Sequence, residues 1–273
     1  MSRGTGISHG AISVMNAIPC GIGSTIGIDL KTTAVFETAD DIVITLKDRP
    51  GMSTLLTETC VRHARESIGE DTGKGYHLTV ETDIPPSMGL KSSSSVCNAV
   101  ISSVLNAYGK GMDEVEMIRL GVECAKECKV TVTGAFDDAC GCQLGGLVLT
   151  DNRMNEIVHR MEIPEYDVII CIPDRTITKD KVPVDRYREL MAEYAFMASI
   201  IRKDYTFVMS ENGKHVADII GDDSGFAAKA MGLGAVAAGI TGTGPATAIL
   251  AKKGDGERIA SAMGCRTIIT TTR

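Results

Sequence analysis

The sequence predicts an α+β protein made of two units. The first 48 residues are rich in β-branched residues between glycine or charged breaks, a pattern that favours strands. Helical patterns follow between residues 53 and 128, and beyond residue 155 strands and helices alternate again. We therefore expect an N-terminal unit over residues 1–155 and a C-terminal unit over residues 156–273.

The elements of the N-terminal unit follow from local patterns. Three strands are expected within residues 9–48. After them we expect a helix, a strand and two more helices, near residues 53–68, 76–82, 93–108 and 113–128. The segment TGAFDDACGCQLGG (133–146) has a short helical centre between glycines and leads into a strand, LVLT.

The C-terminal unit opens with the strand YDVIICI, which a charged, proline-bearing loop over residues 173–185 follows. Helices are expected near residues 185–221 and 224–233, and a strand, a helix and a strand complete the chain.

Composition excludes several classes of function. The 273 residues, 44% of them hydrophobic, suffice for a substantial core. The longest apolar runs fall far short of the roughly 20 residues that span a bilayer. The opening MSRGTGISHG lacks the charged, apolar and small segments of a secretion signal, so we expect a soluble cytoplasmic protein.

Nine cysteines without a C-x-x-C pair predict neither a disulfide framework nor a metal site. We expect most of them to be reduced core residues. The net charge of −7, with no basic block and no tryptophan, gives no electrostatic footprint for nucleic acid or an anionic membrane. We therefore expect a small-molecule partner. The sequence does not specify the oligomeric state.

The segment PPSMGLKSSSS, residues 85–95, places four serines at the start of a predicted helix. The apolar residues that follow recur at helical spacing: Val96, Ala99, Val100, Val104 and Ala107. One serine suffices to cap a helix. The first turn has no Asp or Glu, each of which would stabilise the helix end by about 0.3–1 kcal/mol.

Two interpretations fit this helix start. One is ordinary capping by serine. The other is a cradle for a nucleotide's phosphates, because the helix end is free of carboxylates, follows Gly89, is flanked by Lys91 and is lined with hydroxyls.

Rival motifs fail on spacing or context. GEDTGKG (69–75) has three residues between its first two glycines where a P-loop has four, and GIGSTIG (21–27) misses G-x-G-x-x-G by one residue. GISHG (6–10) fits G-x-S-x-G but has no preceding strand, so we treat it as chance.

Residues 85–95 resemble the ATP-binding signature of the GHMP kinase superfamily, P-x-x-x-G-L-(G/K)-S-S-(A/S)-(A/S). TGAFDDA (133–139) and ITGTGPATAIL (240–250) look like two further superfamily motifs in the expected order. The resemblance implies the two-domain GHMP kinase fold, with an N-terminal domain like ribosomal protein S5 domain 2 and a ferredoxin-like α+β C-terminal domain.

Within the superfamily, GLKSSSS, the doubled aspartate and NAIPCGIGSTIGIDLKT (16–32) resemble the archaeal-type shikimate kinases. This resemblance implies transfer of the γ-phosphoryl group of ATP to the 3-hydroxyl of shikimate with Mg²⁺, a step toward chorismate and the aromatic amino acids. The alternatives are homoserine or mevalonate kinase, an ATP-dependent decarboxylase of the same fold, and a non-catalytic nucleotide sensor.

The resemblance also implies roles for individual residues. ATP would be bound by Pro85, Pro86, Ser87, Met88, Gly89, Leu90, Lys91, Ser92, Ser93, Ser94 and Ser95, with the backbone amides from Met88 to Ser95 around its phosphates. Ser93 would help hold Mg²⁺, with Glu127 as the carboxylate ligand and Glu123 as the alternative. Both glutamates also fit solvated charges on a helix face.

Asp137 matches the family's catalytic base, and Asp138 stands where asparagine is common. Without the resemblance, two aspartates in a loop are typical of turn capping.

For the acceptor, the N-terminal motif offers Ser24, Asp29 and Lys31, and the third motif offers Gly242 and Gly244. A carboxylate on the acceptor needs a cation, ideally a bidentate arginine. Arg175 and Arg186 are candidates, and both also fit surface charges.

Overall fold

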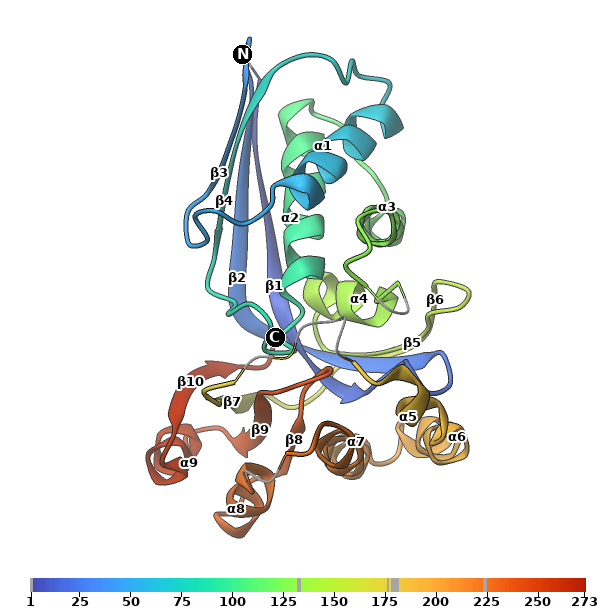
Figure 1. Ribbon diagram of the computed structural model, residues 1–273, viewed down its shortest axis with the longest axis vertical. Coiled ribbons are helices and arrows are strands. Elements are labelled where there is room, and N and C mark those ends of the chain that lie inside the picture. The colour runs from blue at the N-terminus through green and yellow to red at the C-terminus, as the bar shows by residue number, and fades with distance from the viewer. Residues whose placement is uncertain (1, 132–133, 176, 178–181, 223–224) are drawn as a thin grey trace.

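The computed structural model describes residues 2–131, 134–175, 177, 182–222 and 225–273. It has two sheets, each with helices, arranged one below the other in Figure 1. The first residue of the predicted acidic segment 133–139 and part of the predicted loop 173–185 lie outside the described residues.

The first sheet has the order β3-β4-β2-β5-β6, with β1 paired to β2. Its strands are β1 (Arg3–Met15), β2 (Ile22–Thr38), β3 (Ile42–Leu46), β4 (Tyr76–Thr82), β5 (Leu147–Asp151) and β6 (Glu156–Met161). The long strand β2 pairs with β5 near its start and with β4 near its end, and β1 runs antiparallel beside it. Residues near the start of β2 therefore lie close to the segment that follows β5.

Four helices accompany this sheet: α1 (Leu55–Ser67), α2 (Ser92–Ala107), α3 (Glu114–Glu127) and α4 (Phe136–Leu144). Helices α2 and α4 contact its strands directly, whereas α1 and α3 pack mainly on α2 and on each other. Helix α2 lies directly on β1, because Gly4 and Gly6 leave room for its backbone. A Cβ on Gly6 would lie only 2.0 Å from the carbonyl oxygen of Ala99. The polar, glycine-rich opening of the chain is thus a strand built for close helix packing.

The second sheet is antiparallel, with the order β10-β7-β9-β8. Its strands are β7 (Tyr166–Ile172), β8 (Ala237–Ile240), β9 (Thr247–Lys252) and β10 (Arg266–Thr271). The helices of this part are α5 (Val184–Arg188), α6 (Met191–Ile200), α7 (Tyr205–Ile220), α8 (Phe226–Gly232) and α9 (Gly256–Met263).

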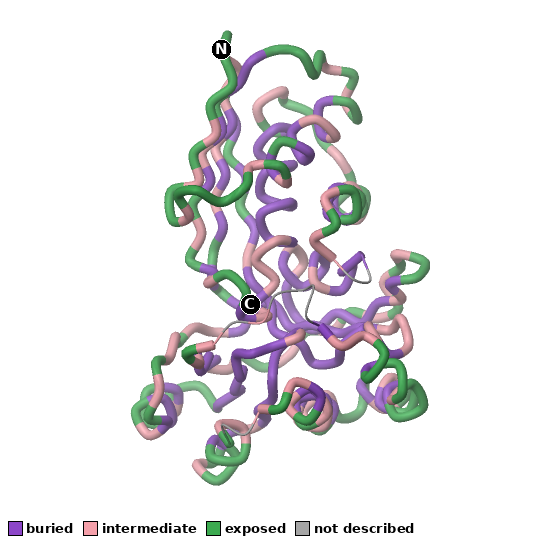
Figure 2. The backbone as a smooth tube through the Cα atoms, in the orientation of Figure 1, coloured by how far each residue is buried: buried purple, intermediate pink, exposed green. Residues whose placement is uncertain are grey.

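A shared core joins the two sheets. Ile12 and Ile26 of the first sheet belong to one apolar cluster with Val168 and Ala248 of the second and Tyr194 of α6. The burial of β1 alternates along its first half and becomes continuous from Gly10 to Met15, where both faces are covered. Figure 2 shows this buried zone where the sheets meet. The β1–β2 turn is therefore held between the two parts of the molecule.

The predicted α+β fold class is confirmed, and the strand expected at residues 76–82 matches β4. Three details differ. Strand β1 begins at Arg3 rather than near residue 9, β6 was not predicted, and β8 and β9 both precede the last helix. The predicted boundary at 155/156 falls in the turn between β5 and β6, which pair in the first sheet. No described helix is long and apolar enough to cross a membrane.

Candidate active site

A cavity of about 460 Å³ lies where α2 and α4 begin. Its wall comes from segments far apart in the sequence, within residues 13–18, 85–94, 129–131, 135–138 and 242–244, together with Ile177. The three motifs found in the sequence therefore meet at one cavity, and the β1–β2 turn completes it.

The loop before α2 is folded tightly against the third motif. Gly89 has φ of 72°, and a Cβ there would lie 2.0 Å from the carbonyl oxygen of Thr241. The hydroxyl of Thr241 donates to the carbonyl of Gly89 at 3.0 Å. Because no side chain fits between them, glycine allows the close approach that joins the two motifs.

Helix α2 begins without any carboxylate in its first turn. Its N-cap residue is Lys91, which has left-handed backbone geometry and makes no side-chain cap bond. Of the serines, Ser92, Ser93 and Ser94 line the cavity, whereas Ser95 is buried and its hydroxyl donates to Thr32 at 2.9 Å. The first-turn amides and the hydroxyls of three serines are thus placed to meet an anion.

The structure brings most of the predicted phosphate-binding segment to the cavity. The residues that line it are Pro85, Ser87, Gly89, Leu90, Lys91, Ser92, Ser93 and Ser94. Pro86, Met88 and Ser95 do not line it, and the side chain of Met88 belongs to the apolar core.

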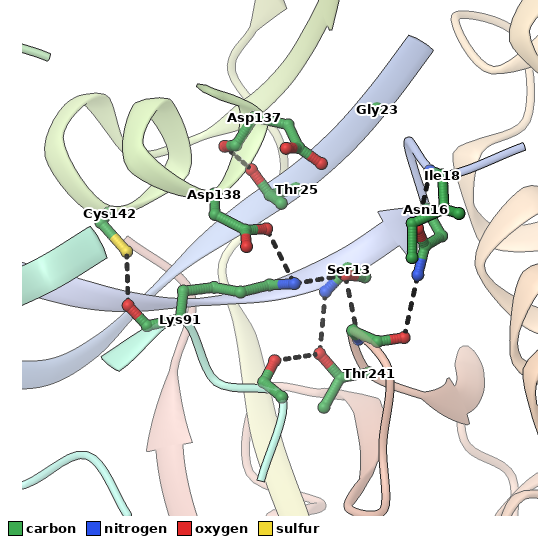
Figure 3. Close-up of polar contacts among 12 residues, drawn as sticks. Ser13, Asn16, Ile18, Gly23, Thr25, Lys91, Asp137, Asp138, Cys142 and Thr241 are labelled. Carbon is green, nitrogen blue, oxygen red and sulfur yellow. Dashed lines mark hydrogen bonds and ion pairs between the residues drawn. The ribbon is translucent and has the colours of Figure 1, made fainter. Parts of the chain in front are cut away.

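Lys91 lines the cavity, and its side chain extends toward Asp138 and Ser13, as Figure 3 shows. Its ammonium lies 2.8 Å from Asp138 Oδ1 and donates to Ser13 Oγ at 2.7 Å. Only 6% of this side chain is exposed, so the charge is paired in a largely dry setting. Ser13 Oγ also accepts from the amide of Gly242 at 3.0 Å. Lys91 therefore connects the starts of α2 and α4 to β1.

Asp137 is the buried carboxylate of the site, with 4% exposure. Burial, and then the neighbouring charge of Asp138, raise the pKa of Asp137 to about 6, while Lys91 and a hydrogen bond from Asn152 oppose the rise. A carboxylate with this pKa is largely ionised at neutral pH and is basic enough to accept a proton.

Helix α4 and strand β2 hold Asp137 in place. The hydroxyl of Thr25 donates to the carbonyl of Asp137 at 2.8 Å (Figure 3). Gly23 faces the carboxylate, and a Cβ there would lie 2.3 Å from Asp137 Oδ2. The carboxylate can occupy this position because β2 has glycine opposite it.

The predicted metal ligand Glu127 lies elsewhere. It is exposed at the end of α3, 2.7 Å from His63 and 2.6 Å from Arg62 of α1. The hydrogen bonds from His63 and Arg62 hold its pKa below the usual value. Glu123 is exposed on the same helix, and neither glutamate is among the described residues that line the cavity.

The candidates from the N-terminal motif also lie outside the cavity wall. Ser24 is fully buried in β2, and its hydroxyl has no hydrogen-bond partner among the residues that the structure describes. Asp29 lies 3.6 Å from His9 and 3.9 Å from Lys31 in a separate charged group. Of the acceptor candidates, Gly242 and Gly244 do line the cavity.

Both predicted arginines bind the C-terminal end of α7. Arg175 donates to Asp222 at 2.7 Å, and Arg186 donates to the carbonyls of Ile219 and Asp218 at 2.6 and 3.1 Å. Basic side chains at this end of a helix satisfy carbonyls that have no partner within the helix. These contacts give both arginines structural roles.

Sequence reasoning missed Ser13, Asn16 and Asn152. The side-chain amide of Asn16 donates to the carbonyl of Gly242 at 3.2 Å, a contact drawn in Figure 3. The backbone amide of Asn16 donates to Asn212 Oδ1 at 2.9 Å. Its place at the head of the NAIP motif was the available signal. Asn152 lies just after a buried strand, where a polar residue is common and therefore carries little information.

The start of α2, which can bind an anion, and the Asp137 carboxylate, which can accept a proton, line the same cavity. Within the described part of the chain, no three Cys, His, Asp or Glu side chains are grouped so that they could hold a metal ion. The helix start and Asp137 together suit a polyanionic substrate and a second substrate whose hydroxyl gives up its proton as it reacts.

Comparisons with known proteins agree with this geometry. Residues 55–146 match the family model of the GHMP kinases N terminal domain. A shikimate kinase from Methanosarcina acetivorans is 38% identical over 92% of this chain and 85% of its own length. Another from Methanosarcina mazei is 38% identical over 95% and 89%.

The crystal structure of Methanococcus jannaschii mevalonate kinase superposes with a TM-score of 0.80, covering 98% of both chains at 15% identity. This likeness shows the shared fold. The sequence relatives, which cover most of both chains, show the family.

Proposed function

This chain belongs to the GHMP kinases, and from that premise we propose that it transfers the γ-phosphoryl group of ATP to the 3-hydroxyl of shikimate, giving shikimate 3-phosphate and ADP. The relatives named shikimate kinase support the acceptor. The observation that carries the chemistry is the meeting of the carboxylate-free start of α2 with buried Asp137 at one cavity. The activity would be cytoplasmic, where ATP is available.

The amides and serine hydroxyls at the start of α2 would hold the phosphates. The start of α2 carries a partial positive charge, and no carboxylate in its first turn neutralises that charge. The polyphosphate of ATP would neutralise it instead. The tight contact between Gly89 and Thr241 keeps this loop against the third motif. Phosphoryl transfer depends mostly on such positioning and charge stabilisation.

Asp137 would act as the base. The acceptor hydroxyl loses its proton to Asp137 as its oxygen bonds to the γ-phosphorus, and the bond from that phosphorus to the β,γ-bridging oxygen breaks to release ADP. Because the pKa of Asp137 is about 6, the carboxylate is ready for this step above that pH. Asp138, paired with Lys91 at 2.8 Å, is occupied and has a supporting role.

For Mg²⁺, the residue that fits is Ser93, whose position on the cavity wall beside the proposed phosphate site suits a ligand shared with phosphate oxygens. Bound Mg²⁺ would neutralise charge that develops on the β- and γ-phosphates. Glu127 is not included in this proposal, because Arg62 and His63 engage its two carboxylate oxygens.

The acceptor would lie toward the β1–β2 turn and the third motif, where Asn16, Gly242 and Gly244 line the cavity. A hydroxylated ring bound there has amide and backbone groups to meet its hydroxyls.

A coupled ADP-release assay with shikimate, homoserine, mevalonate and galactose tests the proposal. We expect turnover with shikimate to exceed turnover with each other acceptor by at least about 10²-fold in kcat/KM, a discrimination that a site built to bond hydroxyls can reach. A preference for homoserine or mevalonate would assign a different kinase. ATP binding without turnover would indicate a nucleotide sensor, and CO₂ release from a carboxylated substrate would indicate a decarboxylase.

A further inference from the structure

A buried asparagine outside the sequence motifs holds Asp137. Asn152 follows β5 and is 3% exposed. Its Nδ2 donates to Asp137 Oδ1 at 2.7 Å, and its Oδ1 accepts from the backbone amide of Asp137 at 3.1 Å. One side chain therefore fixes both the carboxylate and the backbone of the same residue.

The orientation of the Asn152 amide follows from its partners. A backbone N–H can only donate, so the Asn152 atom that faces it is the carbonyl oxygen and the NH₂ group faces the carboxylate. The hydroxyl of Thr150 also donates to Asn152 Oδ1 at 2.8 Å. The backbone amide of Asn152 donates to the carbonyl of Gly21 at 2.8 Å. The asparagine is thus anchored to β5 and to the segment before β2.

The two oxygens of Asp137 have different surroundings. Oδ1 accepts from Asn152, whereas Oδ2 lies beside Gly23, and the backbone amide of Asp138 also hydrogen-bonds to this carboxylate. We propose that Asn152 is a positioning residue for the base: it fixes the carboxylate through Oδ1 and leaves Oδ2 to take the acceptor's proton. This inference rests on the proposed function, because it concerns the base of that reaction.

The charged and titratable groups around Asp137 are few. Its own helix contributes Asp138 and Cys140, and the start of α2 contributes Lys91. Strand β2 faces it with the uncharged Gly23 and Thr25. The hydrogen bond from Asn152 lowers the pKa of Asp137 against the effect of burial, because it stabilises the ionised form.

A purely structural role must be separated from this one. Asn152 Oδ1 accepts a first-turn amide of α4, whose N-cap residue Ala135 makes no side-chain cap bond. Substitution could therefore destabilise α4 without any effect on the ionisation of Asp137. Asn98 offers a matched control, since it is also fully buried and donates to α4, at the carbonyl of Ala139, without touching the carboxylate.

The experiment compares Asn152→Asp, Asn152→Leu and Asn98→Leu in the full chain. Asn152→Asp keeps size and the acceptor for the Asp137 amide but replaces the NH₂ donor with a carboxylate. The first readout is the ¹³C NMR titration of the Asp137 carboxyl, assigned by its loss in Asp137→Asn. The second is the pH profile of kcat/KM with shikimate and Mg·ATP.

Hydrogen bonds to charged groups are worth enough to shift an ionisation by on the order of one pH unit. We expect both Asn152 variants to move the titration midpoint of the Asp137 carboxyl to higher pH by at least that much. The ionised fraction at pH 6, and with it kcat/KM, should then fall about fivefold or more. Asn98→Leu should lower the melting temperature and leave the midpoint in place. If Asn152→Leu does not fold, Asn152→Asp alone decides the question.

An unmoved Asp137 midpoint in the Asn152 variants, or an equal movement in Asn98→Leu, would overturn the inference. Absence of turnover by the wild type with every acceptor would instead count against the proposed function, because the NMR titration does not depend on an acceptor.

Discussion

The two helices that begin at the cavity, α2 and α4, differ in the charge of their first turns. Both follow a residue with left-handed backbone geometry, Lys91 at φ 65° and Ala135 at φ 54°, and neither residue caps its helix through its side chain. The first turn of α2 has no carboxylate, whereas the first turn of α4 contains Asp137 and Asp138. The same helix-end geometry is thus combined with two different charge patterns.

This difference supports the proposal that the two helices serve two different substrates. The partial positive charge at the start of α2 is left for an anion that the protein does not supply. At α4 the protein supplies its own carboxylates, one paired with Lys91 and one held by Asn152 in a buried setting. The donor phosphates would therefore meet α2, and the acceptor proton would meet α4.

The largest expected effect is the loss of the base at α4. Asp137→Asn should lower kcat with shikimate by about 10²–10⁴, because one positioned carboxylate that accepts a hydroxyl proton is worth that much. Nucleotide affinity should stay near that of the wild type, since α2 is a separate element. Steady-state kinetics and ADP titration measure both quantities.

Asp138→Asn is the matched control for this substitution. It should cost less, because asparagine retains an oxygen that can accept from Lys91. If Asp138→Asn abolishes turnover and Asp137→Asn does not, the two aspartates have the opposite roles.

The next effect comes from giving α2 the charge pattern of α4. Ser93→Asp adds a carboxylate to the first turn of α2, where it should stabilise the helix by about 0.3–1 kcal/mol and repel phosphates. We expect the KM for Mg·ATP to rise at least about tenfold while the melting temperature is maintained. Ala228→Asp, in the first turn of α8 and away from the cavity, should leave this KM unchanged. Unaltered ATP kinetics in Ser93→Asp would show that phosphates do not bind at α2.

Removing the bridge between the helices should have a smaller effect. Lys91→Gly suits the left-handed backbone but deletes the ammonium that lowers the pKa of Asp137. The pH below which kcat/KM declines should therefore be higher in this variant. Its activity should fall several-fold at pH 6 and less at pH 8. A profile that coincides with that of the wild type would mean that this ammonium does not influence the base.

The smallest effect concerns stability. The folded-state pKa of Asp137, about 6, lies above its ordinary value of 3.8, so ionisation of Asp137 disfavours the fold as pH rises through this range. Asp137→Asn should melt several degrees higher than the wild type at pH 8, with the difference shrinking toward pH 4. Thermal melts of both proteins at several pH values check this, and a constant difference would contradict it.

Much of the site was predictable because its chemistry depends on short local motifs. The missing carboxylates after Lys91 and the adjacent pair Asp137 and Asp138 are visible in the sequence itself. Gly6 and Gly23 were not interpretable in advance, because their value lies in close approach to α2 and to Asp137 across the fold.

The positions of the candidate Glu127 and of the missed residue Asn152 have a similar physical cause. Glu127 is near Asp137 in sequence, but the end of α3 faces α1, where Arg62 and His63 engage its carboxylate. Asn152 is 15 residues from Asp137 and meets it only because β5 pairs with the start of β2. Such contacts depend on strand register, which a single sequence does not specify for distant segments.

The most direct test of the central claim, that α4 provides the base while α2 holds the phosphates, is the pH dependence of kcat/KM for shikimate phosphorylation. It should be measured for the wild type and Asp137→Asn with both substrates well below KM, where it reports the free enzyme. We predict that kcat/KM of the wild type falls below an apparent pKa of about 6, and that Asp137→Asn is slower and lacks this decline. A decline at low pH that persists unchanged in Asp137→Asn would show that Asp137 is not the base.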